Sequence, residues 1–350
     1  MATLRKLLKN TFFNLFLILV FTAAALWFIL HKDFNQVMTS LAKLNKLWLL
    51  VLALYMMGYH FIIGMIITVL TRLFKKDYRK RQGFVNALIA SFFHGITPSS
   101  TGGQFFQLYV FRHQGIGLSD AANVLWLDFI LYQSTRIGLV FAFLLIRYPA
   151  LNARYHFNIM TLIVLGFLVN AGVIVALWVL TRFRKPYIWL TSTGVELVKR
   201  LHLTKDANAL KAKIVEGVDR FRAELTRVRS YPHVLLQAIL LNACRLTVAY
   251  FFPVVCAWAL GIDLSFIQVI DMFTLTACVF LINAFIPIPG SSGGTEMTFL
   301  MFIGAILSPV AVKSDLLLWR FFSYHFIMVA GSLLFAWFRH QVNVKENSAP

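Results

Sequence analysis

The chain has 350 residues, of which 59% are hydrophobic, 15% aromatic and 13% charged, and its formal net charge is +19. This composition leaves too little polar surface for a soluble globular protein, so we expect an integral membrane protein. We attribute the positive charge mainly to basic segments at the membrane boundary and expect no nucleic-acid partner.

Six apolar runs are close to the ~20 residues that cross a hydrocarbon layer ~30 Å thick. They are Thr11–Leu30, Leu47–Leu70, Ala121–Ile146, Ile159–Leu180, Val234–Leu260 and Leu316–Phe338. Basic residues precede the first run, so a cleaved signal peptide is one interpretation. Its apolar core is long for a signal peptide, which favours a retained signal-anchor helix.

Two further apolar regions, Phe84–Phe111 and Ile267–Leu307, are interrupted by proline, glycine and hydroxyl residues. The interruptions share the pattern Pro-x-Ser-[Ser/Thr]-Gly-Gly, which begins at Pro98 and again at Pro289, 191 residues later. The same displacement brings the apolar runs on either side of the first interruption close to those on either side of the second. We therefore predict an internal duplication of a unit consisting of helix, broken hairpin and helix.

Repeat 1 is predicted at residues 47–146 with its hairpin at 84–111, and repeat 2 at 234–338 with its hairpin at 267–307. The N-terminus, Arg72–Arg81 and Arg182–Arg229 are markedly basic, so all three should be cytoplasmic. They share one side only if the first hairpin enters and leaves the membrane by the same face. We expect both hairpins to be re-entrant, the first from the cytoplasm and the second from outside, with both termini in the cytoplasm.

The predicted fold is an all-α polytopic membrane protein, a single membrane domain over residues 1–350. It has about six transmembrane helices plus two re-entrant helical hairpins in an inverted-topology internal repeat. The basic segment at residues 182–230 has apolar residues on one helical face, which is typical of an amphipathic helix on anionic lipid. It could equally be an ordinary linker between the repeats.

The two interruptions are candidate binding turns, because irregular backbone survives at membrane depth only inside protein or beside a wet cavity. A half-helix N-terminus with free amides and hydroxyls is suited to an anion. The alternative is that they are tight packing turns without a ligand. The candidates are Thr97, Pro98, Ser99, Ser100, Thr101, Gly102, Gly103 and Gln104 in the first turn, and Pro289, Gly290, Ser291, Ser292, Gly293, Gly294 and Thr295 in the second. His94 could add a hydrogen bond, or it could be a satisfied interior histidine.

Three arginines, Arg136, Arg245 and Arg320, lie inside apolar runs, where each needs an anionic partner or water. Asp128 and Glu296 are the available carboxylates. Internal ion pairs or snorkelling near helix ends would explain the charges without a substrate. Three arginines against two carboxylates nevertheless leave room for an anionic ligand, and guanidinium binds phosphate in bidentate fashion.

The motifs TPSSTGGQFFQLYVFR and PIPGSSGGTEMTFL resemble those of the flippase-like membrane domain of the lysylphosphatidylglycerol synthase/flippase family. Members with the complete activity add an amino acid to phosphatidylglycerol and move the product to the outer leaflet of bacteria. The resemblance implies a lipid flippase in the bacterial plasma membrane, with a role in antimicrobial peptide resistance. It covers nearly the whole chain, and because the sequence reaches Pro350 shortly after its last apolar run, we expect no soluble aminoacyltransferase domain.

We expect a carrier rather than an enzyme, with no catalytic residues, no metal and no cofactor. The three cysteines lack metal-ligand or redox spacing, and no nucleophile–base pair or phosphate-binding loop occurs. The expected partner is a membrane lipid with a phosphate-containing head group, anionic or aminoacylated, or a glycolipid or polyprenyl-phosphate sugar. Two alternatives stay open: the membrane part of a phosphatidylglycerol lysyltransferase system, and a lipid-binding subunit for a separate soluble transferase or glycosyltransferase.

Overall fold

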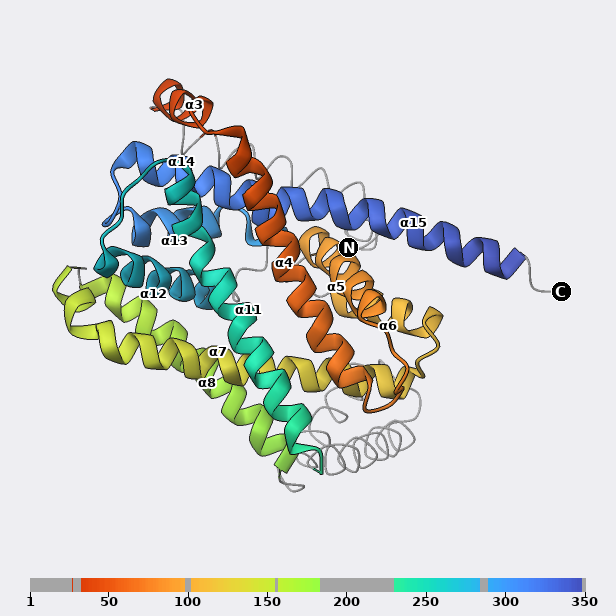
Figure 1. Ribbon diagram of the computed structural model, residues 1–350. Coiled ribbons are helices and arrows are strands. Elements are labelled where there is room, and N and C mark those ends of the chain that lie inside the picture. Colours follow the sequence, from red (N-terminus) through yellow and green to blue (C-terminus); the bar gives the residue numbers. More distant parts are fainter. Residues whose placement is uncertain are drawn as a thin grey trace, which may run out of the picture.

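The computed structural model describes residues 27, 33–97, 102–154, 157–182, 230–283 and 289–347 (Figure 1). Within these residues the regular structure is entirely helical. The first half contains α3 (Phe34–Ala42), α4 (Lys46–Thr71), α5 (Lys80–Ile96), α6 (Gly102–His113), α7 (Leu118–Arg154) and α8 (Phe157–Arg182). The second half contains α11 (Pro232–Ala259), α12 (Phe266–Asn283), the short turn η2 (Pro289–Ser291), α13 (Gly294–Ile303), α14 (Pro309–Arg320), the π-helical η3 (Phe321–Phe326) and α15 (Ile327–Asn347).

Helices α4 and α11 run side by side through the middle of the molecule (Figure 1). The Tyr55 hydroxyl on α4 donates a hydrogen bond of 2.8 Å to the carbonyl of Val248 on α11. The Tyr55 ring also stacks on Phe252, with 5.1 Å between ring centroids. These two helices therefore join the first and second halves of the chain.

Small residues allow α5 to approach α4 closely. A Cβ at Gly64 would lie 2.6 Å from the Cα of Phe84, and a Cβ at Gly83 would overlap the carbonyl of Gly64. Glycines at such contacts are typical of helix pairs in membranes, where close backbone packing replaces the hydrophobic effect as the driving force.

The exterior is apolar and several charges are interior, which is the reverse of a soluble protein. Leu54 and Leu168 are 61% and 58% exposed, whereas Arg136 and Glu296 are 5% and 2% exposed. Five described helical segments are long and apolar enough to cross a membrane. The chain is therefore an all-α, multi-pass membrane protein, as its sequence predicts.

The predicted spans correspond to described helices with three differences. The run Thr11–Leu30 lies outside the described residues except for Trp27. Helix α12, taken as a hairpin arm, is by itself long enough to span a membrane. The run Leu316–Phe338 is not one regular helix, because α14 begins at Pro309 and η3 interrupts the helix with π geometry.

Each interrupted region forms a helix pair joined by a short break. Helices α5 and α6 pack against each other, and so do α12 and α13. We call these the first and second helix pairs. Their breaks coincide with the two Pro-x-Ser-[Ser/Thr]-Gly-Gly motifs, although residues 98–101 and 284–288 lie outside the described part.

Candidate functional site

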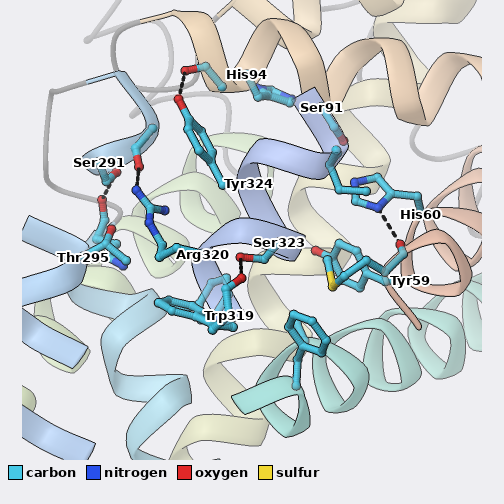
Figure 2. A pocket seen from close by; sticks show the side chains of 18 of the residues that line it. Tyr59, His60, Ser91, His94, Ser291, Thr295, Trp319, Arg320, Ser323 and Tyr324 are labelled. Carbon is cyan, nitrogen blue, oxygen red and sulfur yellow. Dashed lines mark hydrogen bonds between the residues drawn. The ribbon is translucent and has the colours of Figure 1, made fainter. Parts of the chain in front are cut away.

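A cavity of about 370 Å³ lies between the two helix pairs and the central helices. All three arginines predicted from the sequence, Arg136, Arg245 and Arg320, line it. Ser91 and His94 contribute from the first helix pair (Figure 2). The second helix pair contributes Asn283, Gly290, Ser291 and Thr295. One chamber therefore collects intramembrane charge from three different helices.

Arg320 holds the second turn in place. Its Nε donates to Glu296 Oε1 at 2.7 Å. Its Nη2 donates to the carbonyl of Gly290 at 3.0 Å (Figure 2). The guanidinium also lies over the ring of Tyr324, 4.8 Å from its centroid. The remaining Glu296 oxygen accepts from the amide of Gly293 at 2.6 Å, which caps the N-terminus of α13.

At this helix end a carboxylate of the protein itself occupies one of the backbone amides. An amide at the N-terminus of α13 does bind an anion, but the anion is the carboxylate of Glu296. The physical reason is that Glu296 is the third residue of α13, the position from which an acidic side chain reaches back to the capping residue. Arg320 in turn neutralises this carboxylate.

The second turn needs unusual backbone angles. Gly290 and Gly293 have φ values of +62° and +87°, and Ser291 has a φ of +50°. Side chains with a Cβ seldom adopt this left-handed region, so the two glycines are required by conformation. At Gly290 a Cβ would also overlap the hydroxyl end of Tyr324.

Tyr324 connects the second turn with the first helix pair. Its hydroxyl donates to the carbonyl of Gly95, near the end of α5, at 3.0 Å. Figure 2 shows Tyr324 between that carbonyl and Arg320. Because Arg320 also binds the Gly290 carbonyl, the two helix pairs are linked through side chains of α14 and η3.

The described residues on either side of the first turn are joined by a hydrogen bond and by close packing. The Thr97 hydroxyl accepts from the amide of Gly102 at 2.9 Å. A Cβ at Gly103 would overlap the ring of His94, so glycine is needed here for close approach. Gln104 is exposed. The predicted residues Pro98, Ser99, Ser100 and Thr101 lie outside the described residues.

Arg136 and Arg245 share the aromatic ring of Tyr132. Their Cζ atoms lie 5.7 Å and 4.3 Å from its centroid. Arg136 Nη2 donates to Asn170 Oδ1 on α8 at 2.6 Å. Asn170 in turn donates to the carbonyl of Leu281 on α12 at 3.3 Å, so Arg136 is tied to the second helix pair.

The two candidate carboxylates interact with different arginines. Glu296 pairs with Arg320, as described, while Asp128 lies within electrostatic reach of Arg245. In the described part of the chain, the hydrogen-bond partner of Arg136 is an uncharged amide.

Six predicted residues line the cavity and others lie outside it. Those that line it are Arg136, Arg245, Gly290, Ser291, Thr295 and Arg320. The described predictions that do not line it are Thr97, Gly102, Gly103, Gln104, Asp128, Pro289, Ser292, Gly293, Gly294 and Glu296. Several of these shape the turns that present the lining residues.

Sequence reasoning missed several lining residues. They include Tyr59, His60, Ser91, Asn283, Trp319, Ser323 and Tyr324. A usable signal existed for one of them: Tyr324 is four residues after Arg320, a spacing that brings side chains together on a helix. Nothing comparable marks Tyr59 or Ser91 within their apolar runs.

A second cavity, of about 360 Å³, lies on the other side of the Arg320–Glu296 pair. Both members of that ion pair line it, whereas only Arg320 lines the first cavity. Its other lining residues are mainly leucines of α3, α4 and α14, including Leu41, Leu49 and Leu317.

A family model described as "Lysylphosphatidylglycerol synthase TM region" matches residues 15–331. The chain belongs to this family. It is also 22% identical to an uncharacterized protein of Mycoplasma pneumoniae, the MG306 homolog, over 95% of this chain and 88% of that relative. Family membership connects the chain with membrane lipid.

Proposed function

We propose that the protein is a lipid translocator that passes a phosphate-containing head group through the arginine-lined cavity. The observation that carries this proposal is the meeting of Arg136, Arg245 and Arg320 at one chamber between the two helix pairs. Placing an arginine at membrane depth costs at least ~2.5 kcal/mol on insertion scales. Three arginines at one cavity therefore indicate a functional site.

A phosphate group fits this chamber. Guanidinium groups bind phosphate oxygens in bidentate fashion, and such charge-assisted hydrogen bonds are stronger than neutral ones. The Nε of Arg136 and the Nε of Arg245 are buried and have no hydrogen-bond partner among the described residues. An anionic ligand that draws either guanidinium towards the cavity would satisfy a donor that now lacks a partner.

The helix pairs support movement across the membrane rather than static binding. Two interrupted units arranged with opposite topology are characteristic of alternating-access carriers, whose binding site lies where the units meet. In our proposal the first pair enters from the cytoplasm and the second from outside, in the bacterial plasma membrane, and both termini are cytoplasmic. The π-helical η3 carries two cavity residues, and such segments often occur at functional sites.

Reconstitution tests the proposal. We would place the purified protein in proteoliposomes containing fluorescently labelled phosphatidylglycerol and measure exchange between leaflets by quenching from outside. We expect exchange with the native chain and at least about tenfold slower exchange with Arg136→Gln, which loses a charged donor. Arg81→Gln, outside the cavity on the exposed side of α5, is the control. Saturable lipid binding without exchange would favour a lipid-holding subunit for a separate transferase.

Cysteine labelling tests the opposite orientation of the helix pairs. In a Cys244→Ser background, cysteines at Ser119, just after the first helix pair, and at Ala305, just after the second, would be exposed to aqueous reagents. We expect labelling from the cytoplasmic face at residue 119 and from the outer face at residue 305. Labelling of both from one face would exclude the inverted arrangement.

A further inference from the structure

The cavity is lined by three arginines and, among the described residues, by no carboxylate. The two turn segments outside the described part, residues 98–101 and 284–288, contain no aspartate or glutamate in the sequence. A ligand that enters the cavity therefore meets cationic side chains without a facing acidic group.

The charges around the cavity leave one cation in excess. Glu296 neutralises Arg320, and Asp128 interacts with Arg245. Arg136 has only the Asn170 amide as its hydrogen-bond partner among the described residues. A ligand with a single negative charge would balance the site, whereas a ligand with net positive charge would add to the excess.

The uncharged polar residues of the lining suit hydroxyl groups. Ser91, Asn283, Ser291, Thr295 and Ser323 all line the cavity. Hydroxyl and amide side chains both donate and accept hydrogen bonds, as the hydroxyls of a glycerol or a sugar do.

Aromatic rings could in principle hold an ammonium group by cation–π attraction. The ring of Tyr324 is already occupied by Arg320, with 4.8 Å between Cζ and the ring centroid. An ammonium at the remaining aromatic lining residues would lie in the same chamber as Arg136, whose charge no carboxylate of the described residues balances, and repulsion between the two cations opposes it.

We infer that the cavity selects a lipid whose head group bears one phosphodiester and hydroxyl groups but no ammonium. The inference rests on the proposed function, since it names the substrate class of the same site. The inferred lipid differs from the lysylated lipid in the family description, because the head group of lysylphosphatidylglycerol has two ammonium groups and one phosphate. The hydroxylated anion could be a glycerophospholipid or a sugar phospholipid.

The test is a binding comparison with the full-length protein in detergent. Four lipids would be compared by competition: phosphatidylglycerol, phosphatidylinositol, phosphatidylethanolamine and lysylphosphatidylglycerol. We expect either or both of the first two to bind at least about tenfold more tightly than the lysylated lipid, which corresponds to ~1.4 kcal/mol. The balance between phosphatidylglycerol and phosphatidylinositol identifies the glycerol or the sugar source.

A negative charge placed in the cavity tests whether the cationic lining causes the preference for phosphatidylglycerol. Ser91→Asp adds a carboxylate to the lining, and Ser91→Asn is the uncharged control of similar size. We expect the aspartate variant to lose most of the preference for phosphatidylglycerol over lysylphosphatidylglycerol, while the asparagine variant keeps it. Thermal unfolding of both variants verifies that they are folded.

The outcomes separate the inference from the proposed function. Equal or tighter binding of lysylphosphatidylglycerol to the native chain would overturn the inference and leave lipid translocation intact. An unchanged preference in a folded Ser91→Asp variant would overturn the electrostatic explanation. Saturable binding of none of the four lipids would overturn both the inference and the head-group site.

Discussion

The two helix pairs share the Pro-x-Ser-[Ser/Thr]-Gly-Gly motif, but the contacts around the motif differ. The second turn is fastened by charge, because Arg320 joins Glu296 and the Gly290 carbonyl. In the first pair the arms are joined by aromatic packing, with Phe93 stacked on Phe106 and both rings against Phe335 of α15. The arms of the second pair are also packed by apolar residues, such as Leu281 of α12 and Phe299 of α13, so the buried ion pair at the turn is an addition that the described part of the first pair lacks.

The contacts of Arg136 and Arg320 also differ between the two helix pairs. In the sequence, Arg136 and Arg320 each lie in the apolar run that follows a broken hairpin. Arg320 does contact its own turn, but Arg136 reaches Asn170 on α8, and through it Leu281 on α12. Both arginines are thus connected to the second helix pair.

The largest effect is expected from Arg320→Gln. Removing this guanidinium leaves the Glu296 carboxylate buried and unpaired, which costs roughly 3–5 kcal/mol. The double variant Arg320→Gln/Glu296→Gln should recover most of that stability, as measured by thermal unfolding in detergent. Arg136→Gln leaves only an amide without its partner and should cost less, about 1.5–3 kcal/mol. Equal losses at both arginines would contradict the asymmetry.

A pair of glycine substitutions sharpens the account of the second turn. Gly290→Ala and Gly293→Ala both place a Cβ at positive φ, which costs roughly 1–2 kcal/mol. Only the Cβ at residue 290 meets a neighbour, the Tyr324 hydroxyl, so this variant should lose a further ~1–3 kcal/mol. Thermal unfolding would show the difference, and equal losses would mean that the Tyr324 contact is unimportant.

In the first turn the corresponding substitution should cost less. Gly103→Ala forces the His94 side chain to move, with a cost of roughly 1 kcal/mol if the ring adjusts. The double variant Gly103→Ala/His94→Ala has no clash, so it should lose less stability than the sum of the losses of the two single variants. A double-mutant cycle of unfolding free energies measures this coupling. A coupling energy near zero would show that the His94 contact does not constrain this turn.

The smallest effect is expected where the two pairs are linked. Tyr324→Phe deletes the hydrogen bond to the Gly95 carbonyl, which is worth about 0.5–1.5 kcal/mol. Tyr148→Phe, at a side chain that is 44% exposed, is the control. A loss equal to that of Arg320→Gln would place the main connection at Tyr324 instead of the ion pair.

Most described helices could be predicted from the sequence, because apolar runs mark the helices and Pro/Gly/Ser interruptions mark the breaks between them. The sequence also predicts the three cavity arginines, since charges inside apolar runs are rare and expensive. It cannot predict that Arg136 contacts Asn170, because that choice depends on how α7 packs against α8 and α12. Tyr59 and Tyr324 were missed for a similar reason: with 34 phenylalanines and 11 tyrosines, an aromatic residue in an apolar run carries little information.

The hydropathy pattern also does not predict the π-helical segment η3. The run Leu316–Phe338 is apolar throughout apart from a few polar residues, so its pattern indicates one regular helix. The interruption places Ser323 and Tyr324 towards the first cavity and Phe321 and His325 towards the second. The distribution of these side chains between the two cavities depends on the π-helical backbone geometry, which hydrophobic periodicity does not predict.

The most direct measurement of the central claim is photo-crosslinking with a phosphatidylglycerol analogue that carries a diazirine in its head group. After irradiation in proteoliposomes, the labelled peptides would be mapped by mass spectrometry. We expect labelling at cavity residues such as Ser91 and Ser323, and we expect excess unlabelled lipid and Arg136→Gln to reduce it. Labelling confined to exposed residues of the outer surface, such as Leu54 and Leu168, and insensitive to Arg136→Gln would contradict it.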